Sequence, residues 1–370
     1  MTLLGDNRLK LGVFAANLDG GLTATTAPER HRLNWPNVRA VAQAADRAGF
    51  ELQVPLARWR SLGGVTDFNG RNYEPLTWAA GLSASTDRSD IFATVHVPVI
   101  HPILAAKQMT TVDHISGGRF GLNLVCGWFP AEFEMFGSSM MGHEDRYAYA
   151  GEWLDVVRRL WTAEEEFDFE GRFFRIVKGW QQPKPIRKPM PPVMNAGQSP
   201  TGARFAARHA DIAFQSVNEG DSFEDTRAKF SALRRLAREE FGREIQIWTG
   251  CWSVCAPTER AALDYLDRCI RAYGDPGALD SLPKEVLPPL DGTPPEVLER
   301  IKLKALAGWG GAHLVGTPDQ IVEKLVEFSN AGADGIVVSW VNYLDGIQDW
   351  TREILPRLEQ AGLRAPAQPI

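Results

Sequence analysis

An amide residue lies in the middle of the apolar stretch GGRFGLNLVCGW, residues 117–128, which is predicted to form a short buried strand. Side chains alternate between the two faces of a strand. One face carries the bulky Phe120, Leu122, Leu124 and Cys126 and suits the helix layer of a barrel. The other carries small residues and Asn123, and suits the barrel interior. Because a buried amide without hydrogen-bond partners costs about 1–3 kcal/mol, Asn123 either bonds to a neighbouring strand or faces a polar ligand.

Three other polar residues have types that suit ligand binding. Thr94, in FATVH, allows the same two interpretations as Asn123, although threonine is common in strands. Arg146, in HEDRYAY, carries a planar guanidinium that fits a phosphate, but an arginine at a helix start is more often solvated or paired. Ser199, in NAGQSPTG, precedes a helical segment, and such a loop presents backbone N–H groups to an anion. Without a ligand it would be an ordinary turn serine.

Histidine and cysteine positions predict no metal site. His96, His101, His114 and His143 do not show the spacing of metal ligands. The cysteines fit no common zinc pattern, and CWSVC is one residue too long for the C-x-x-C redox motif. We expect all four cysteines to be reduced and mostly buried.

The elements that must position these residues follow a repeated order. An alanine-rich amphipathic helix, a turn and an apolar strand recur in five segments, of which VRAVAQAADRAGFELQV is the first. Three further strands are predicted in LKLGVFAANL, DIFATVHVPV and PPVMNAGQS, which gives eight in all. Strands that alternate with helices form parallel βαβ units, and eight units close a (β/α)8 TIM barrel. An open doubly wound sheet would more often carry G-x-G-x-x-G after its first strand, and LGVFAANLDGGL has none.

Two segments are longer than a normal connection between a strand and its helix. They are predicted as insertions after strands 4 and 7, at about 128–190 and 256–331, within a single domain over 1–370. Long insertions at the carboxyl ends of barrel strands tend to form active-site lids. A surface excursion or an oligomer contact is an equally good interpretation.

Composition excludes several classes of protein. The chain has 370 residues, 44% of them hydrophobic, which is enough for a large core. A net charge of −6 and the lack of a long basic run argue against binding nucleic acid or an anionic membrane. No apolar run reaches the length of about 18 residues that spans a bilayer, and the first residues do not resemble a signal peptide. We therefore expect a cytoplasmic protein.

Several longer segments resemble the bacterial luciferase-like flavin monooxygenases. The segments are HPILAAKQMTTVDHISGGRFGLNLVCGW, DRYAYAGEWLDVVRRLW, FDFEGRFFRI, QPKPIRKPMPPVMNAGQSPTG and HLVGTPDQIVEKL. The resemblance covers nearly the whole chain and is strongest at 91–210. It is greatest to the two-component group that uses reduced FMN, which includes pyrimidine, dimethyl sulfone, dibenzothiophene sulfone and alkanesulfonate monooxygenases. The family fold is a TIM barrel with insertions, as the strand count predicts.

The resemblance also implies site residues, position by position. The small pocket in which dioxygen meets the reduced flavin would be lined by the catalytic residues Asn123, Thr94 and Val54. The FMN would be bound by Ala57, Arg58, Asn123, Glu132, Arg146, Tyr147 and Ser199. The pyrimidine enzyme has Ile-Lys where this chain has Ala57-Arg58, so the cation is kept. Taken alone, Glu132 would be interpreted as a surface acid.

The implied activity is monooxygenation of a small organic substrate of the N-heterocycle, sulfone or sulfonate class. Reduced FMN and dioxygen would react through a flavin (hydro)peroxide at C4a or N5, and the match at Asn123 and Thr94 favours N5. A separate NAD(P)H:flavin reductase would supply the reduced FMN, and the chain would form a homodimer or homotetramer. Two alternatives stay open: a luciferase-like oxidoreductase that uses a deazaflavin for hydride transfer, and a non-catalytic flavin-binding protein on the same barrel.

Overall fold

The computed structural model describes residues 4–366, except 218–220, 280–300, 304 and 309–310. The strands are β1 Lys10–Phe14, β2 Leu52–Val54, β3 Asp90–His96, β4 Phe120–Val125, β5 Phe167–Glu170, β6 Arg175–Gly179, β7 Val193–Asn195, β8 Ile212–Phe214, β9 Gln246–Cys255, β10 Ala312–Gly316 and β11 Gly335–Ser339. The helices are α1 Trp35–Arg47, α2 Pro75–Ser83, α3 Pro102–Ile115, α4 Pro130–Met135, α5 His143–Thr162, α6 Pro200–His209, α7 Phe223–Phe241, α8 Glu259–Asp267, α10 Pro318–Ala331, α11 Tyr343–Asp349 and α12 Leu355–Gln360.

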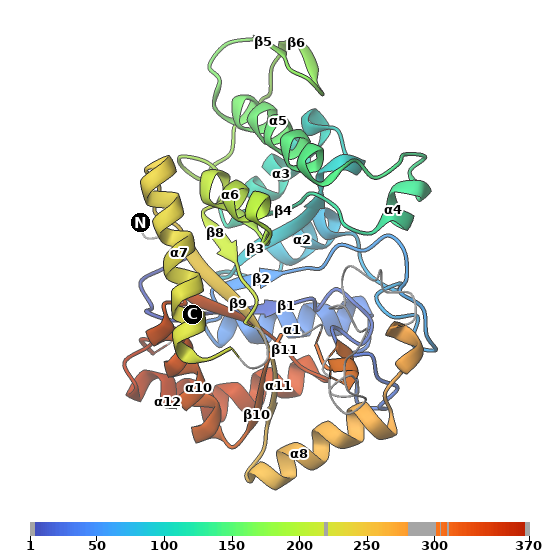
Figure 1. Cartoon of the computed structure of the whole chain (residues 1–370), viewed down its shortest axis with the longest axis vertical. Helices are drawn as coiled ribbons and strands as arrows, with labels where there is room; N and C mark the ends of the chain where they lie inside the picture. The colour runs from blue at the N-terminus through green and yellow to red at the C-terminus, as the bar shows by residue number, and fades with distance from the viewer. Residues whose placement is uncertain (1–3, 218–220, 280–300, 304, 309–310, 367–370) are drawn as a thin grey trace.

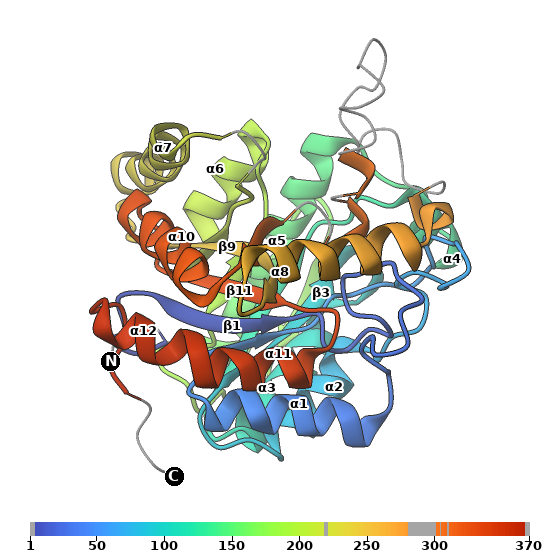
Figure 2. The same ribbon diagram turned by 90° about the horizontal axis from the view of Figure 1, so that it is seen from below.

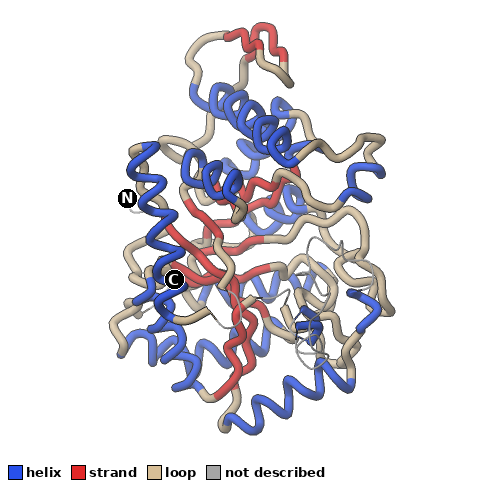
Figure 3. Tube along the Cα trace, viewed as in Figure 1, coloured by secondary structure: helices blue, strands red, loops and turns tan. Residues whose placement is uncertain are grey.

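A closed ring of parallel strands forms the centre of the molecule (Figure 3). The main sheet runs β10-β9-β11-β1-β2-β3-β4-β7-β8, and a further pairing of β8 with β9 closes it. Of its nine strands, β10 pairs with the carboxyl-terminal half of β9, beyond the residues of β9 that pair with β8, so the closed ring itself has eight strands. These eight are the predicted strands, and helices lie between them along the chain, so the (β/α)8 TIM barrel is confirmed.

Helices surround the ring on all sides in the view of Figure 2, where α1, α2 and α3 lie below the strands and α5, α6 and α7 above them. Local sequence fixes where several of these helices begin. Asn34, Ser199 and Thr317 each cap a helix by accepting a hydrogen bond from a backbone N–H of its first turn, and a proline follows in the first two helical positions. Such caps satisfy N–H groups that have no partner within the helix. Among the described helices, none is both long and apolar enough to cross a membrane.

Strand β4 has the two faces that the sequence predicts. Its bulky residues join the core between the ring and the helices, with Met109 of α3 and Trp153 of α5. Its small face points inward, since a Cβ added at Gly121 would lie 2.3 Å from the ring of Phe92. Phe92 belongs to the apolar interior of the barrel, together with Leu52, Val54, Met194, Ile212, Trp248 and Val337. Asn123 follows Gly121 on the same face.

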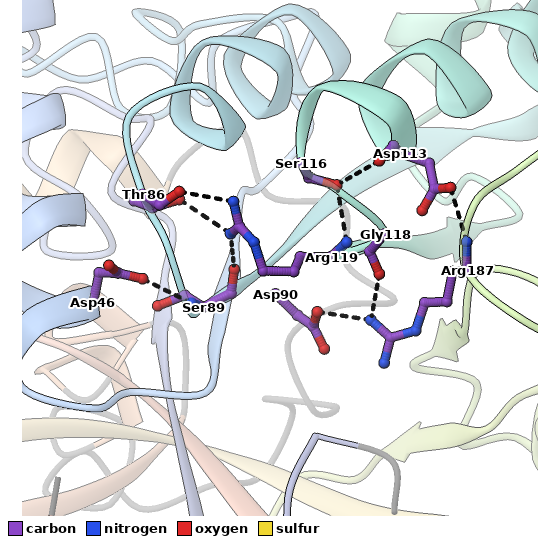
Figure 4. Close-up of polar contacts among 9 residues, drawn as sticks. All are labelled: Asp46, Thr86, Ser89, Asp90, Asp113, Ser116, Gly118, Arg119 and Arg187. Carbon is purple, nitrogen blue, oxygen red and sulfur yellow. Dashed lines mark hydrogen bonds and ion pairs between the residues drawn. The ribbon is translucent and has the colours of Figure 1, made fainter. Parts of the chain in front are cut away.

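A hydrogen-bond network ties the loops together at the amino ends of β3 and β4 (Figure 4). The guanidinium of Arg119 donates to the carbonyl of Ser83, at the end of α2, and to those of Thr86 and Ser89 in the loop that leads to β3. Asp46 accepts from three successive N–H groups of the same loop. Arg187 pairs with Asp90 at 2.7 Å. Since the donors of Arg119 are used on the chain itself, this network holds the fold together.

The two long connections extend from the carboxyl ends of β4 and β9, as predicted. The first contains α4, α5 and the antiparallel hairpin β5–β6, which stands at the top of Figure 1. The second contains α8, β10 and α10, and its residues 280–300 lie outside the described ones. The sequence analysis did not predict β5, β6 or β10. Whether 1–370 is one domain stays a prediction.

Candidate active site

A cavity of about 310 Å³ opens at the carboxyl ends of the barrel strands. Cavities that bind small molecules have volumes of about 300–1,000 Å³, and TIM barrels place their sites at this end. The strands contribute to its wall Phe14, Val54, Thr94, His96, Asn123, Met194, Asn195, Phe214 and Val337. The loops that follow β2, β4 and β7 contribute most of the rest. The wall is therefore built from strand ends that the ring holds in register.

Thr94 and Asn123 form a bonded pair on neighbouring strands, in register across β3 and β4. The amide Nδ2 of Asn123 donates to Oγ1 of Thr94 at 3.0 Å, and Oγ1 of Thr94 donates to the carbonyl of Pro55. The other amide atom, Oδ1 of Asn123, is buried and has no hydrogen-bond partner among the described residues. The two interpretations of Asn123 are thus both partly realised: one amide atom bonds to a neighbouring strand, and the other is left for a ligand.

Arg58 and Glu132 form a buried ion pair at the edge of the cavity. Nη1 of Arg58 lies 3.3 Å from Oε1 of Glu132, and the two residues are 5% and 3% exposed. The same carboxylate oxygen accepts from the backbone N–H of Trp59 at 2.7 Å. The guanidinium also lies over the indole of Trp128, 4.6 Å from its centroid. Glu132 does not line the cavity; it fixes the loop after β2 to α4 and balances the charge of Arg58, whose pKa burial lowers.

His96, two residues after Thr94 on β3, is also part of the cavity wall. Its Nδ1 lies 3.6 Å from Oε2 of Glu132. Burial and the nearby charge of Arg58 lower the pKa of His96 to about 3. The imidazole is therefore neutral at physiological pH.

Arg146 and Tyr147 reach the site from the first two turns of α5. The guanidinium of Arg146 donates to the carbonyl of Gly127, and its Nε is buried without a partner among the described residues. Tyr147 lines the cavity, and burial raises the pKa of its hydroxyl, which therefore stays protonated. Cys126 lies close by, and burial raises the pKa of its thiol to about 12.

The amino terminus of α6 faces the same region. Oγ of Ser199 accepts from the N–H of Gly202 at 3.1 Å and lies 3.1 Å from Nε2 of His143. The loop before the helix packs closely on its first turn, because a Cβ at Gly197 would lie 2.6 Å from the carbonyl oxygen of Gly202. A helix amino terminus with a hydroxyl and a nearby arginine is a favourable place for a phosphate.

The structure brings all the predicted site residues to one end of the barrel. Val54, Ala57, Arg58, Thr94, Asn123 and Tyr147 line the cavity. Glu132, Arg146 and Ser199 stand next to it through the contacts described above. Sequence reasoning missed His96 and Trp128 as wall residues. The alternation along β3 could have found His96, since it shares a face with Thr94.

The cavity wall carries little charge. Among its described residues Arg58 alone has an ionised side chain, and Glu132 neutralises it. The described part of the chain contains no group of three or more His, Cys, Asp or Glu residues placed to hold a metal ion. The arrangement thus offers an apolar pocket with a few polar atoms, next to a region suited to a phosphate.

Comparison with known proteins agrees with this geometry. Residues 9–335 match the luciferase-like monooxygenase family. The chain belongs to this family. It is 28% identical over 357 residues to an FMNH2-dependent dimethylsulfone monooxygenase of Pseudomonas putida, covering 95% of this chain and 96% of that one. It is 31% identical over 381 residues to the pyrimidine monooxygenase RutA of Escherichia coli O150:H5 (strain SE15), covering 100% and 97%.

The barrel of this chain has the same fold as a solved structure. DmoA from Hyphomicrobium sulfonivorans superposes with a TM-score of 0.84 at 20% identity, over 96% of this chain and 89% of that one. The cavity at the carboxyl ends of the strands is therefore part of a barrel fold that this chain shares with DmoA.

Proposed function

We propose that the protein is a two-component monooxygenase that uses reduced FMN and dioxygen to oxygenate a small organic substrate. The observation that carries the proposal is the cavity itself. At its base the Thr94–Asn123 pair leaves one amide oxygen unpaired, and beside it lie Arg146 and the amino terminus of α6. The name of the related FMNH2-dependent dimethylsulfone monooxygenase supports FMNH2 as the cofactor.

The residues present fit FMN. A flavin ring carries polar atoms that can satisfy the unpaired Oδ1 of Asn123, and its phosphate suits the donors at Ser199, the first turn of α6 and Arg146. Ala57, Arg58 and Trp128 would contact the ring, and Tyr147 would offer a protonated hydroxyl. Glu132 would act by holding Arg58.

When bound, reduced FMN supplies the electrons with which dioxygen is activated. The chain's own task is to orient, to exclude water and to place hydrogen bonds. Val54 and the apolar strand ends keep water from the reacting centre, and Thr94 and Asn123 direct their polar atoms at the small pocket beside it. Asn123 donates to Thr94, and Thr94 donates to the carbonyl of Pro55. These hydrogen bonds fix both side chains before any ligand binds.

The proposal also covers the partner protein, the cellular compartment and the oligomeric state. Reduced FMN would come from a separate NAD(P)H:flavin reductase, and the chain would work in the cytoplasm as a homodimer or homotetramer. In support of a separate reductase, the first strand is not followed by the G-x-G-x-x-G motif of nicotinamide-binding domains.

One experiment tests this function. Purified protein, FMN, NADH and a flavin reductase are incubated with uracil, dimethyl sulfone and methanesulfonate, and products are followed by mass spectrometry in ¹⁸O₂. We expect one ¹⁸O atom in the product of at least one probe class, and only when the reductase is present. Direct reduction of FMN by NADPH on this chain alone would contradict the two-component arrangement. Turnover with a reduced deazaflavin and no uptake of dioxygen would contradict monooxygenation.

A further inference from the structure

The cavity wall carries both hydrogen-bond donors and hydrogen-bond acceptors. Oδ1 of Asn123 is an acceptor without a partner among the described residues. The bonded donors of Arg58 and Asn123 are used on Glu132 and Thr94, and Nε of Arg58 is a buried donor without a partner among the described residues. The ring of His96 can serve as either donor or acceptor, as can the hydroxyl of Tyr147. The tautomer of His96 therefore decides whether the wall offers a second acceptor beside Oδ1 of Asn123.

The surroundings of His96 select one tautomer. Nδ1 lies 3.6 Å from the carboxylate Oε2 of Glu132, which is beyond hydrogen-bond length but close enough for the negative charge to act on the ring. A carboxylate favours the proton on the ring nitrogen that faces it. Glu132 cannot turn away, because its other oxygen accepts from Arg58 and from the N–H of Trp59. The ring is neutral, so Nε2 is left without a proton and acts as an acceptor.

We propose that Nε2 of His96 accepts a hydrogen bond from the substrate, and that the site is built for an uncharged substrate carrying an N–H donor, such as a cyclic amide. This rests on the proposed function, and it selects among the substrate classes considered there. A sulfone has no N–H to offer. A sulfonate brings a negative charge to a wall whose one described cation, Arg58, is already neutralised. Glu132 is then a positioning residue for His96 as well as for Arg58.

A binding measurement tests the proposal without turnover. The protein is labelled with ¹⁵N-histidine, and the signals of His96 are assigned by their loss in His96→Gln. Between pH 6 and 8 we expect a neutral ring with the proton on Nδ1. Added uracil should shift the Nε2 signal, whereas 1,3-dimethyluracil, dimethyl sulfone and methanesulfonate should not. A proton on Nε2, or no shift with uracil, would overturn the proposal.

A pair of substitutions supplies a second test. The amide of glutamine reaches the place of Nε2, whereas that of asparagine reaches the place of Nδ1. His96→Gln should therefore keep much of the affinity for uracil, and His96→Asn should lose about tenfold, the value of one hydrogen bond. His101→Gln, at the exposed cap of α3, is the matched control. If both His96 variants bind uracil with the same affinity, or lose the same affinity together with a lowered Tm, His96 has a structural role only.

These outcomes are separable from failure of the proposed function. If no probe is oxygenated but uracil shifts the His96 signal, the assignment of His96 stands and the reaction type is wrong. If dimethyl sulfone is oxygenated and uracil neither binds nor reacts, the monooxygenase stands and the assignment of His96 is wrong.

Discussion

Polar atoms that the fold leaves unpaired are the most informative feature at the scale of single residues. A buried donor or acceptor without a partner costs about 1–3 kcal/mol. Asn123 and Arg146 each hold such an atom beside the cavity, while the rest of each side chain is anchored, on Thr94 and on Gly127. An anchored side chain with one free atom is oriented before the ligand arrives, so little ordering entropy is lost on binding.

Replacing Arg146 by alanine should weaken FMN binding without unfolding the protein. A hydrogen bond to a charged group contributes about 1.5–3 kcal/mol, so we expect the affinity to fall about ten- to hundredfold, measured by titration with reduced FMN under nitrogen. The control is Arg172→Ala. Arg172 is exposed and pairs with Asp145, the residue before Arg146 in α5. Equal affinities in Arg146→Ala and wild type would assign Arg146 to the structure alone.

Replacing Asn123 by alanine should uncouple oxidation from product formation. The structural cost is small, because Oγ1 of Thr94 keeps its bond to the carbonyl of Pro55. The side chain carries no charge for the phosphate, so FMN affinity should largely remain while reduced flavin is oxidised to give peroxide in place of product. Product formed per dioxygen consumed, measured beside the Tm, decides the matter. A lower Tm with an unchanged product ratio would contradict a catalytic role.

The sequence predicted the helices and strands well in segments where hydrophobic residues recur at a regular spacing. The alternation of apolar and small residues on β4, and the helix–turn–strand repeat, gave the eight strands and the inward face of Asn123. Contacts between residues far apart in the sequence leave no such regular spacing. The ion pair of Arg58 and Glu132 joins residues 74 positions apart, so Glu132 alone suggested only a surface acid. The extra strand β10 was missed because its pairing with β9 lies outside the barrel repeat.

At the scale of elements, Glu132 should hold α4 and the loop after β2 together. Glu132→Gln leaves the buried guanidinium of Arg58 without a counter-charge, and breaking a buried pair in this way costs about 3–5 kcal/mol. We expect a clearly lower free energy of unfolding in urea, together with weaker FMN binding. Glu134→Gln, on the exposed side of the same helix, should change neither. If the two variants unfold at the same urea concentration, the pair does not fasten the loop to α4.

At the scale of the whole molecule, the two ends of the barrel differ in how their polar groups are used. At the amino ends of the strands, Arg119, Arg187 and Arg243 bond to carbonyls and carboxylates of the chain. At the carboxyl ends, hydrogen bonds fix side chains and still leave atoms facing the cavity. The arginines at the amino ends thus act on the chain itself, whereas the unpaired atoms of Asn123 and Arg146 lie beside the cavity, at the end where TIM barrels place their sites.

Three buried histidines spread over the molecule predict how its stability depends on pH. Burial lowers the pKa of His31 to about 4 and those of His96 and His209 to about 3. Nε2 of His31 donates to the carbonyl of Ala16 and its Nδ1 accepts from Asn37, while Nδ1 of His209 accepts from Arg158, so neither ring can take a second proton without losing a contact. The unfolded chain protonates its histidines near pH 6.5. As the pH falls below 6.5, the unfolded state therefore binds more protons than the folded state, and stability is lost.

The loss should approach about 1.4 kcal/mol per pH unit for each of the three histidines between pH 6 and 4.5. Urea unfolding over this range measures the slope. His31→Gln keeps a side-chain amide to donate to Ala16 but cannot be protonated, so it should reduce the slope by about one histidine's share. Measuring the variant at pH 7.5 as well separates any cost of the substitution itself, since all three rings are neutral there in both states. A slope unchanged by His31→Gln would show that this histidine takes up its proton in the folded protein, and that its burial does not limit stability in acid.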